Sequence, residues 1–404
     1  MASLFEDELH NEFGSWPLAY IPYGGADFGE ILAVARAVGD GDDGAFHNAW
    51  VSAGDRLAAE AAECERTGRL VSARELYLRA STFYSASYHP LYGFPVDPRL
   101  LAAFRKQTDV LDKGFALFDP PVRALKIPFE GTPMPAYFIP ASGAADRVRP
   151  LLILTNGYDA TITDMYFASA AAASRRGYHC LMFDGPGQGA MLYERGIHLR
   201  PDWETVVKAV VDFALGLPGV DASRIALSGG SLGGYLAPRA ASGEPRLAAC
   251  IADPGRMGIA TSFGGFLARL GITAAVGSRP SDLDQQVLDR MMEVVSSNRK
   301  LYWTFVQRGY WVHGVDNLRD YLRSAEQFTM EDRIETMTCL TLVTQAESDP
   351  LSEEALTFFD RLRCPKTLLR FATAEGAGDH CEMGNRSLLN RRALDWLDAT
   401  LGVG

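Results

Sequence analysis

Residues 226–238 read ALSGGSLGGYLAP and place Ser231 between Gly229 and Gly233 in the pattern G-x-S-x-G. The apolar run RIALSG predicts a strand that enters the serine, and LGGYLAPRAAS predicts a helix that leaves it. Glycines at these two positions allow a sharp strand-to-helix turn, which exposes the hydroxyl at the helix N-terminus. This context favours a nucleophilic serine over a structural turn. A phosphate-binding P-loop is not indicated, because no lysine follows the glycines.

Apolar runs of strand length recur after residue 121, and most are separated by helix-length segments. They read PLLILTNG, HCLMFDG, RIALSGG, LAACIADP, CLTLVTQ and KTLLRFA. Runs that are apolar on both faces are typical of parallel strands covered by helices on each side. VRALKIPF and MPAYFIP, joined by a turn at residues 130–132, predict an antiparallel hairpin before them. The predicted fold is α/β, an α/β-hydrolase fold with a mostly parallel, doubly wound sheet.

Two segments depart from this alternation. The first is N-terminal and helical, with one helix expected over residues 46–66, a turn at 67–68 and a second helix to about residue 85. No second copy of this hairpin follows at a fixed period, so a solenoid is not expected. The second segment lies between Asp253 and Met337, where no strand is predicted and residues 281–314 are helical and rich in aromatic residues. We therefore expect an N-terminal helical domain over residues 1–120 and a hydrolase domain over 121–404, with a helical lid insertion over about 255–335.

Net charge and residue content limit the classes of binding partner that we expect. The chain has 404 residues, a formal net charge of −11 and 47% apolar residues, as in globular proteins. This charge opposes binding to nucleic acid and to anionic lipid. The acidic start MASLFEDELHNEFG does not resemble a signal peptide, so a cytoplasmic location is expected. The six cysteines show neither C-x-x-C pairs nor metal-site spacing, so neither a zinc site nor a disulfide framework is predicted.

A serine nucleophile needs a base and an orienting acid, which follow it in the chain order Ser, acid, His in this fold. Of the seven histidines, His313 and His380 lie after Ser231. His380 stands between the last predicted strand and the last helix, where the base is expected. His313 belongs to the predicted lid and is interpreted as a substrate-binding or packed residue.

The acid is expected at the end of the strand in TLVTQAESDPLSEE. Asp349 has the usual offset from that strand and is preferred to Glu347. Asp253, after the strand that follows the predicted nucleophile, is a third candidate. Asp379, beside His380, is interpreted as a solvated loop charge.

The negative charge that forms on an attacked carbonyl requires two N–H donors. One is expected at Leu232, directly after the serine, and the other at Tyr158 in the loop NGYDATITDMY. An aromatic-rich lid suits a flat, apolar ligand, although aromatic residues at helical spacing also pack in cores. The residues expected to contact substrate are Asp159, Tyr310, Trp311 and His313.

A rival pattern occurs in LMFDGPGQGA, where Gly185, Gly187 and Ala190 fit the dinucleotide fingerprint G-x-G-x-x-A after a strand. The following segment, MLYERGIHLRPDWE, contains a proline and no good helix start. No strand-ending acid lies about twenty residues further on to bind a ribose. We therefore expect no nucleotide cofactor and no metal, and interpret this loop as part of the site's rim or of the sheet scaffold.

Four motifs carry a family resemblance: NGYDAT, FDGPGQG, GGSLGGYLAPRAA and GAGDHCEMGNR. In this order, and with the helical N-terminal and lid segments, the chain resembles over nearly its whole length the α/β-hydrolases that include 2,6-dihydroxypseudooxynicotine hydrolase and the fungal polyketide-shortening hydrolases of pigment biosynthesis. The resemblance implies hydrolysis of a carbon-carbon bond in an aromatic ketone or 1,3-dicarbonyl, and a homodimer. It implies that the N-terminal helices, over residues 1–120, form a cap domain. It also implies a Ser231, Asp349 and His380 triad, with the amides of Tyr158 and Leu232 as the oxyanion hole.

Several reactions remain open for this triad, because the residues do not specify which bond is cleaved. The same triad serves an esterase, lactonase or peptidase, and an acyltransferase or cyclase when a substrate group replaces water. A non-catalytic binding protein on the same fold is a further alternative, because a fold does not fix a function. That alternative is disfavoured, because all three triad positions are filled.

Overall fold

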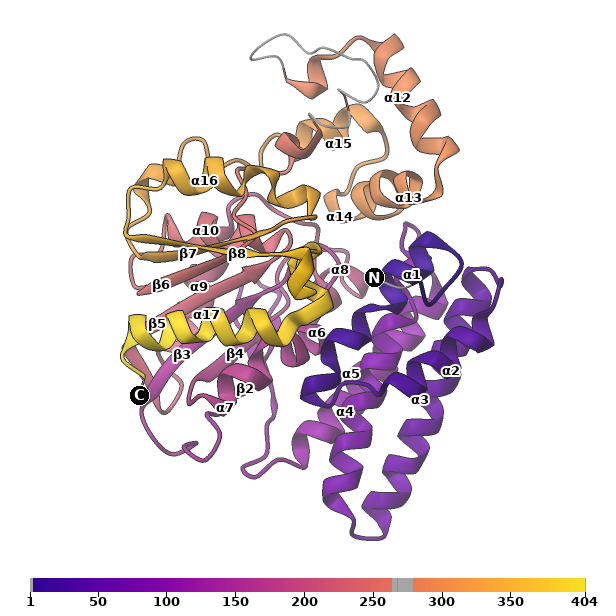
Figure 1. The fold of residues 1–404 in the computed structure, drawn as a ribbon, viewed down its shortest axis with the longest axis vertical. Coiled ribbons are helices and arrows are strands. Elements are labelled where there is room, and N and C mark those ends of the chain that lie inside the picture. Colours follow the sequence, from indigo (N-terminus) through magenta and orange to yellow (C-terminus); the bar gives the residue numbers. More distant parts are fainter. Residues whose placement is uncertain (1–2, 264–266, 268–278, 404) are drawn as a thin grey trace.

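The structure is a computed structural model that describes residues 3–263, 267 and 279–403. Its eight strands form one sheet in the order β1-β2-β4-β3-β5-β6-β7-β8 (Figure 1). The strands are β1 (Ala124–Ile127), β2 (Met134–Ile139), β3 (Arg149–Thr155), β4 (His179–Phe183), β5 (Val220–Gly230), β6 (Ala249–Asp253), β7 (Leu340–Ala346) and β8 (Lys366–Phe371). β2 pairs antiparallel with both β1 and β4, and all other pairs are parallel. The predicted hairpin and the predicted mostly parallel sheet are confirmed.

Helices cover both faces of the sheet, as the apolar strands require. Every residue of β4 and of β6 is buried. One face packs against α9 (Trp203–Ala214) and α10 (Gly233–Ala241), in a core that includes Val206, Val207, Val210, Tyr235 and Leu236. The other face packs against α7 (Ala171–Arg175) and α17 (Arg386–Leu401), in a core that includes Ala170, Ala173, Leu389, Leu394 and Leu397.

The N-terminal segment is helical and lies beside the sheet rather than over either face (Figure 1). It contains α1 (Glu8–Gly14), η1 (Trp16–Tyr23), α2 (Phe28–Val38), α3 (Asp43–Arg66), α4 (Leu70–Ala86) and α5 (Pro98–Ala116). α3 and α4 form the predicted helical hairpin. α3 begins at Asp43 rather than at residue 46, because the side chain of Asp42 accepts a hydrogen bond from the N–H of Ala45 and caps the helix.

The predicted lid is helical where the structure describes it, although residues 264–266 and 268–278 of this prediction lie outside the described residues. It contains α12 (Gln285–Ser297), α13 (Arg299–Tyr302), the π-helix η6 (Trp303–Tyr310), α14 (Trp311–His313) and α15 (Leu318–Ala325). Between β6 and β7 the described residues form no strand and one isolated bridge, from Gly258 to Thr329. α13 lies beside α1 (Figure 1), and Lys300 pairs with Glu12 at 2.9 Å and with Glu8 at 3.1 Å.

Short helices connect these parts. They are η2 (His89–Leu91), α6 (Ile162–Met165), η3 (Tyr166–Ala170), α8 (Gly189–Tyr193), η4 (Ala260–Ser262), η5 (Pro280–Asp282), η7 (Ile334–Thr336), η8 (Pro350–Glu354), α16 (Ala355–Arg361), η9 (Thr373–Glu375) and η10 (His380–Asn385). One expectation is corrected: α9 starts at Trp203, inside the segment MLYERGIHLRPDWE for which no good helix start was predicted, whereas α8 starts at Gly189, two residues before that segment. α8 is short. It has five residues, and its first turn is closed by the N–H of Met191, which donates to the carbonyl of Gln188.

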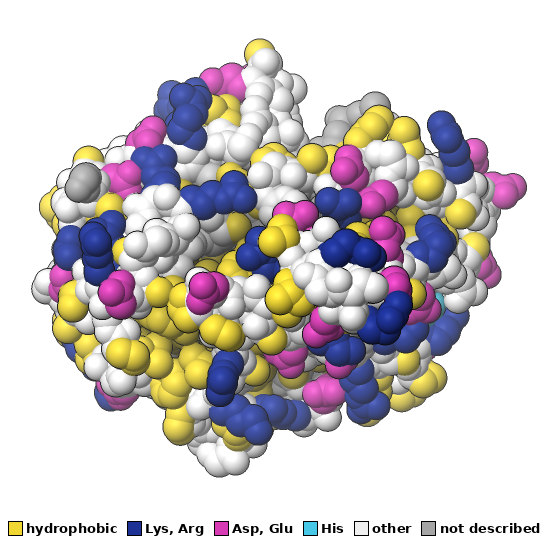
Figure 2. All heavy atoms as spheres, turned by 90° about the horizontal axis from the view of Figure 1, so that it is seen from below, with side chains coloured by type: hydrophobic (Ala, Val, Ile, Leu, Met, Phe, Trp, Pro, Cys, Tyr) yellow, Lys and Arg dark blue, Asp and Glu magenta, His cyan; other side chains and the backbone are white. Residues whose placement is uncertain are grey.

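Acidic and basic side chains are interspersed on the face that Figure 2 shows, so this face has no single large acidic patch. Within the described part of the chain, no helix is long and apolar enough to cross a membrane. All six cysteines are buried and free.

Candidate active site

Ser231 lies at the turn between β5 and α10. Its φ is +60°, a left-handed conformation that is unfavourable for a non-glycine residue. The N–H of Ser231 donates to the carbonyl oxygen of Asp253 on the neighbouring strand β6 at 2.7 Å, which stabilises this conformation. A Cβ at Gly229 would lie 2.3 Å from the carbonyl oxygen of Gly233, so the turn requires a glycine there. The predicted strand-turn-helix arrangement of G-x-S-x-G is present.

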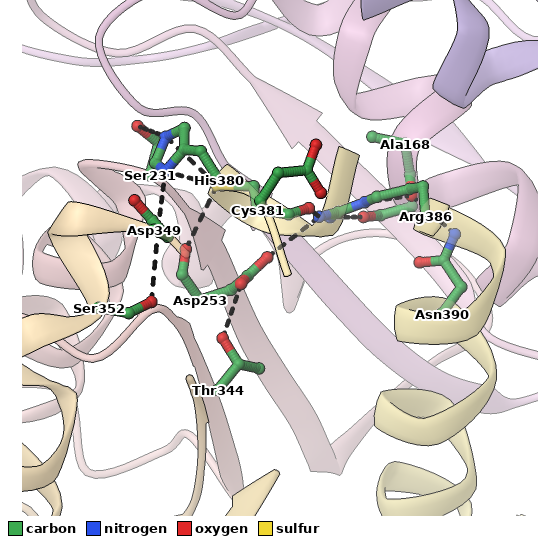
Figure 3. Close-up of polar contacts among 12 residues, drawn as sticks. Ala168, Ser231, Asp253, Thr344, Asp349, Ser352, His380, Cys381, Arg386 and Asn390 are labelled. Atoms are coloured by element: carbon green, nitrogen blue, oxygen red, sulfur yellow. Dashed lines mark hydrogen bonds and ion pairs between the residues drawn. The ribbon is translucent and has the colours of Figure 1, made fainter. Parts of the chain in front are cut away.

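His380 links the serine to a buried carboxylate (Figure 3). The hydroxyl of Ser231 lies 2.9 Å from Nε2 of His380, and Nδ1 of the same ring lies 2.9 Å from Oδ2 of Asp349. The other carboxylate oxygen of Asp349 accepts a hydrogen bond from the N–H of Leu351 at 2.9 Å. The Asp349 side chain is 1% exposed, whereas that of His380 is 38% exposed. The structure therefore brings all three predicted residues into one hydrogen-bonded chain.

The two titrating groups of this chain shift each other. Burial acts to raise the pKa of Asp349, but the hydrogen bond and charge of His380 outweigh it, so that pKa is below its usual value. Burial acts to lower the pKa of His380, but the neighbouring Cys381 thiol and the Asp349 carboxylate reverse the effect and raise that pKa. A buried carboxylate beside Nδ1 favours the tautomer in which Nε2 is free to accept the serine proton.

The other acids do not contact His380. Glu347 accepts a hydrogen bond from the N–H of Thr373 at 2.7 Å. Asp253 binds Arg386 and Thr344 instead. Asp379 is not a free solvated charge, which corrects that expectation: its two carboxylate oxygens accept from the N–H of Gly384 at 2.9 and 3.1 Å and close the loop.

The two predicted oxyanion donors lie on either side of the serine. Leu232 follows Ser231 at the start of α10, and Tyr158 lies in the loop after β3. A Cβ at Gly157 would lie 3.0 Å from Cβ of Ser231 and 3.1 Å from the backbone nitrogen of Leu232, so this loop passes directly against the turn. Within the described residues, the backbone N–H groups of Tyr158 and Leu232 have no hydrogen-bond acceptor. Both are therefore available to a ligand.

The side chain of Tyr158 is fixed by the lid. Its hydroxyl lies 2.6 Å from Nε2 of His313, and Nδ1 of His313 lies 2.8 Å from the hydroxyl of Ser324. The guanidinium of Arg308 stacks over the Tyr158 ring at 4.5 Å from its centroid. Burial, together with the charges of Arg308 and His198, lowers the pKa of His313 to about 3. His313 is thus a neutral residue that holds the Tyr158 side chain.

Asp159 connects the same loop to the lid and to the N-terminal helices. Its carboxylate binds Arg308 at 3.0 Å. Its backbone carbonyl oxygen accepts hydrogen bonds from Nε2 of His89 and from the hydroxyl of Tyr92, both at 3.2 Å. Burial raises the pKa of Asp159, and the charge of Arg308 opposes this rise.

The lid aromatics chiefly contact other aromatics. The ring of Trp311 stacks on Tyr193 at 5.3 Å and meets the ring of Tyr92 edge-on at 5.2 Å. Trp303 stacks on Tyr92 at 5.5 Å, and its indole N–H donates to the carbonyl oxygen of His89. Tyr310 is half-buried, with its hydroxyl 3.4 Å from Sδ of Met292. This aromatic cluster joins the lid to the N-terminal helices.

The loop with the rival glycine pattern supports the loop after β3 that carries Tyr158. The side-chain amide of Gln188 donates to the carbonyl oxygens of Asn156 and Gly157 at 2.8 and 3.1 Å. Asn156 in turn donates to the carboxyl group of Asp184 at 2.7 Å, and burial raises the pKa of Asp184 to about 8. No cluster of three His, Cys, Asp or Glu residues that could hold a metal ion occurs in the residues described.

Sequence reasoning missed three residues of this site. Arg308 reads as an ordinary charge on an aromatic helix, and His89 carried no motif. Tyr92 lies among other aromatic residues of the N-terminal segment, but nothing in the sequence indicated that it binds the carbonyl oxygen of Asp159.

Comparison with known proteins identifies the family. The profile described as the alpha/beta hydrolase family matches residues 152–387. The chain is 33% identical over 402 residues to the hydrolase LUC6 of a Fusarium species, covering 96% of this chain and 95% of that protein. It is 31% identical over 411 residues to the 20-hydroxy-prefusarin hydrolase FUS2 of Gibberella moniliformis, covering 96% of this chain and 95% of that protein.

A solved structure has the same fold along nearly the whole chain. The 2,6-dihydroxy-pseudo-oxynicotine hydrolase superimposes with a TM-score of 0.73 at 21% identity, covering 95% of each chain. At this identity the likeness concerns the fold. The resemblance inferred from the four motifs is confirmed, and the chain belongs to the alpha/beta hydrolase family.

Proposed function

We propose that Ser231 is the nucleophile of this hydrolase, His380 its general base and acid, and Asp349 the carboxylate that orients His380. The observation that carries the proposal is the hydrogen-bonded chain through the three residues, with 2.9 Å at each of its two steps. A serine hydroxyl becomes nucleophilic when a positioned base removes its proton. The backbone N–H groups of Tyr158 and Leu232 are the proposed oxyanion donors.

The first step adds Ser231 to a substrate carbonyl. Oγ of Ser231 bonds to the carbonyl carbon, and its proton passes to Nε2 of His380. The carbonyl oxygen becomes an oxyanion, to which Tyr158 and Leu232 donate. The guanidinium of Arg308, stacked over the Tyr158 ring, holds the residue that carries one of these donors.

We infer that the bond broken next is a carbon-carbon bond of an aromatic ketone or polyketide 1,3-dicarbonyl, in secondary metabolism or aromatic degradation. Collapse of the adduct leaves an acyl ester on Ser231 and sends the bonding electron pair to the departing carbon, which leaves as an enolate from a 1,3-dicarbonyl or as an electron-rich arene from an aromatic ketone. His380 returns its proton to that carbon. Water, deprotonated by His380, then hydrolyses the ester. The products are a carboxylic acid and the shortened ketone or the arene, and one water is consumed.

Two observations support this substrate class. The four motifs resemble those of carbon-carbon bond hydrolases, and one relative is named a 20-hydroxy-prefusarin hydrolase. Among the residues expected to contact substrate, Asp159 has a buried oxygen, Oδ1, without a hydrogen-bond partner in the described residues. We propose that Oδ1 accepts from a substrate hydroxyl, whereas Trp311, Tyr310 and His313 shape the site from the lid.

The test is a fluorophosphonate probe combined with a substrate panel. The probe should label the wild type and not Ser231→Ala, and this variant should lose at least about 10⁴-fold in turnover. The panel sets p-nitrophenyl esters beside 1,3-diketones and acyl-phloroglucinols, with products identified by mass. Cleavage of esters with every diketone untouched would contradict the carbon-carbon assignment and keep the serine. Labelling of neither protein would favour a binding protein.

A further inference from the structure

A buried ion pair lies beside the proposed triad, between β6 and α17 (Figure 3). Oδ2 of Asp253 accepts a hydrogen bond from Nη1 of Arg386 at 3.0 Å, and the two side chains are 4% and 10% exposed. Oδ1 of Asp253 accepts from the hydroxyl of Thr344 on β7 at 2.7 Å. The steps described above use neither Asp253 nor Arg386. Because burial of two charges is costly, such a pair requires a full set of partners.

Asp253 contacts both sides of the triad. Its backbone carbonyl oxygen accepts from the N–H of Ser231 at 2.7 Å and thus supports the strained nucleophile turn. The same oxygen lies 3.7 Å from Sγ of Cys381, the residue that follows His380. One residue at the end of β6 therefore touches the nucleophile turn and the loop that carries the base.

Arg386 holds the loop that carries His380. Besides its bond to Asp253, Nη1 donates to the carbonyl oxygen of Cys381 at 2.8 Å. Nε donates to the carbonyl oxygen of Ala168 and Nη2 to the hydroxyl of Ser169, both at 3.1 Å. The guanidinium thereby connects the His380 loop, β6 and η3. This planar fork of donors is a geometry that lysine cannot reproduce.

The loop held in this way is strained. Cys381 and Glu382 have φ values of +52° and +50°, two consecutive left-handed residues that are not glycine. Such residues persist only where the surroundings impose them. This turn determines where the preceding residue, His380, presents its imidazole. The strain is thus located where a displaced loop would separate Nε2 from the hydroxyl of Ser231.

We propose that Asp253 and Arg386 are positioning residues that hold the left-handed Cys381–Glu382 turn against the nucleophile strand and thereby keep His380 within hydrogen-bond distance of Ser231. The inference deepens the proposed function and rests on the assignment of Ser231 and His380. Asp253 and Arg386 do not touch the reacting atoms, so they affect the rate of the step that needs the base and not the binding of substrate.

The experiment measures turnover in Arg386→Met, Arg386→Lys and the double variant Asp253→Asn/Arg386→Met. Active sites are counted by fluorophosphonate labelling, so that kcat refers to folded, reactive protein. We expect Arg386→Met to lower kcat and the rate of phosphonylation together by at least tenfold, with KM within twofold of the wild type. Arg386→Lys should recover part of the loss, because it pairs with Asp253 but cannot also reach Cys381, Ala168 and Ser169.

The double variant removes both charges, so it leaves no unpaired buried charge if Arg386→Met alone fails to fold. It still lacks the bond to Cys381 and should show the same loss in kcat. The matched control is Arg392→Met, on the same helix. Arg392 forms a partly exposed ion pair with Glu375, so this variant should leave kcat unchanged.

The outcomes separate this inference from the proposed function. A kcat per labelled site within twofold of the wild type, in folded Arg386→Met or in the double variant, would overturn the positioning role while Ser231 stays the nucleophile. A KM that rises with kcat unchanged would also overturn it. If the wild type and Ser231→Ala hydrolyse substrate equally, the proposed function fails, and the positioning role fails with it.

Discussion

The candidate site has two halves that are held in different ways. The half with Ser231, His380 and Asp349 stands on the ends of β5, β7 and β8, and its partners come from the sheet and from α17. The half with Tyr158 and Asp159 lies on the loop after β3, and its side chains and carbonyl are bound by residues of the lid and of the N-terminal helices.

Because the two halves are held by different parts of the chain, the proposed chemical step and the fit of the substrate depend on different segments. The groups proposed to move the proton are held by the hydrolase sheet and α17 and form no hydrogen bond to the described part of the lid, so we expect them to stay in place when the lid changes. The loop with the proposed oxyanion donor Tyr158 depends on the lid through Arg308 and His313, and on the N-terminal helices through His89. A different lid would therefore alter the binding of substrate and of the oxyanion while leaving the nucleophile and base unchanged.

The largest expected effect on turnover comes from a substitution in the first half, the one with Ser231, His380 and Asp349. Asp349→Asn keeps the shape of the side chain but removes the charge that orients His380, so kcat should fall by about 10³- to 10⁴-fold. The loss of the carboxylate should also lower the pKa of His380, because Asp349 contributes to the rise of that pKa. Steady-state kinetics across pH measure both changes, and the acid limb of kcat/KM should move to lower pH.

Glu347→Gln is the matched control for this prediction. Glu347 lies on the same loop but accepts from the N–H of Thr373, so its variant should stay within about twofold of the wild type. If Glu347→Gln lost the larger share of turnover, the assignment of the acid would be wrong.

The next largest effect on turnover is expected from a substitution that disturbs the backbone of the second half, the loop after β3. Gly157→Ala places a Cβ 3.1 Å from the nitrogen of Leu232, in the space beside the proposed oxyanion donor. Loss of one oxyanion donor costs about 10²- to 10³-fold in kcat, and we expect a loss of this size. Tyr158→Phe gives the comparison, because it removes the hydroxyl bound to His313 but keeps the backbone N–H. Its loss should stay below about tenfold, and an equal loss in both variants would contradict the backbone role.

The two halves also differ in how far the sequence predicts them. The strands, the turn at Ser231 and the positions of Asp349 and His380 depend on local signals, namely apolar runs, glycine spacing and chain order. These signals predict the sheet and the residues at its strand ends. The helix start at Trp203 was missed, because the proline at residue 201 argued against a helix in that segment.

Long-range polar contacts could not be predicted from the sequence. Arg386 and Asp253 are separated by 133 residues, and Arg308 and Asp159 by 149. Arg386 and Arg308 read locally as surface charges, and each pairing appears only when the packed chain excludes water from both partners. For the same reason Asp253 was a candidate acid in the sequence, although its carboxylate is occupied by Arg386.

A smaller effect tests the dependence of the second half on the lid. Arg308→Met leaves the carboxylate of Asp159 without its ion-pair partner in a nearly buried position. The free energy of unfolding should fall by about 3 kcal/mol, and turnover by about tenfold through the displaced Tyr158. Adding Asp159→Asn should restore most of the stability, which denaturant unfolding would measure. Arg323→Met, at an exposed lid ion pair with Asp320, should change stability by less than about 0.5 kcal/mol.

The smallest effect concerns the first half and its pH dependence. Burial, followed by the charge of Asp253, raises the pKa of Glu382 well above its usual value, so the folded protein keeps this proton at pH values where the unfolded chain has lost it. Below pH 4.5 the group does not affect folding. As pH rises from there toward the folded pKa, the unfolded chain ionises and the folded one does not, so about 1.4 kcal/mol of stability is lost per pH unit. Glu382→Gln removes this loss, so its melting temperature should fall less than that of the wild type between pH 5 and 8.

Glu375→Gln, in the same region, is a control for the direction in which stability changes with pH. The hydrogen bond from Arg392 lowers the pKa of Glu375, so the stability that this carboxylate contributes is present above its usual pKa and is lost as pH falls through the lowered value. Between pH 5 and 8 this variant should therefore follow the slope of the wild type. Parallel slopes for Glu382→Gln and the wild type would mean that Glu382 is ionised in the folded protein. The buried network behind His380 would then carry one more negative charge, opposite Arg386, than the structure assigns to it.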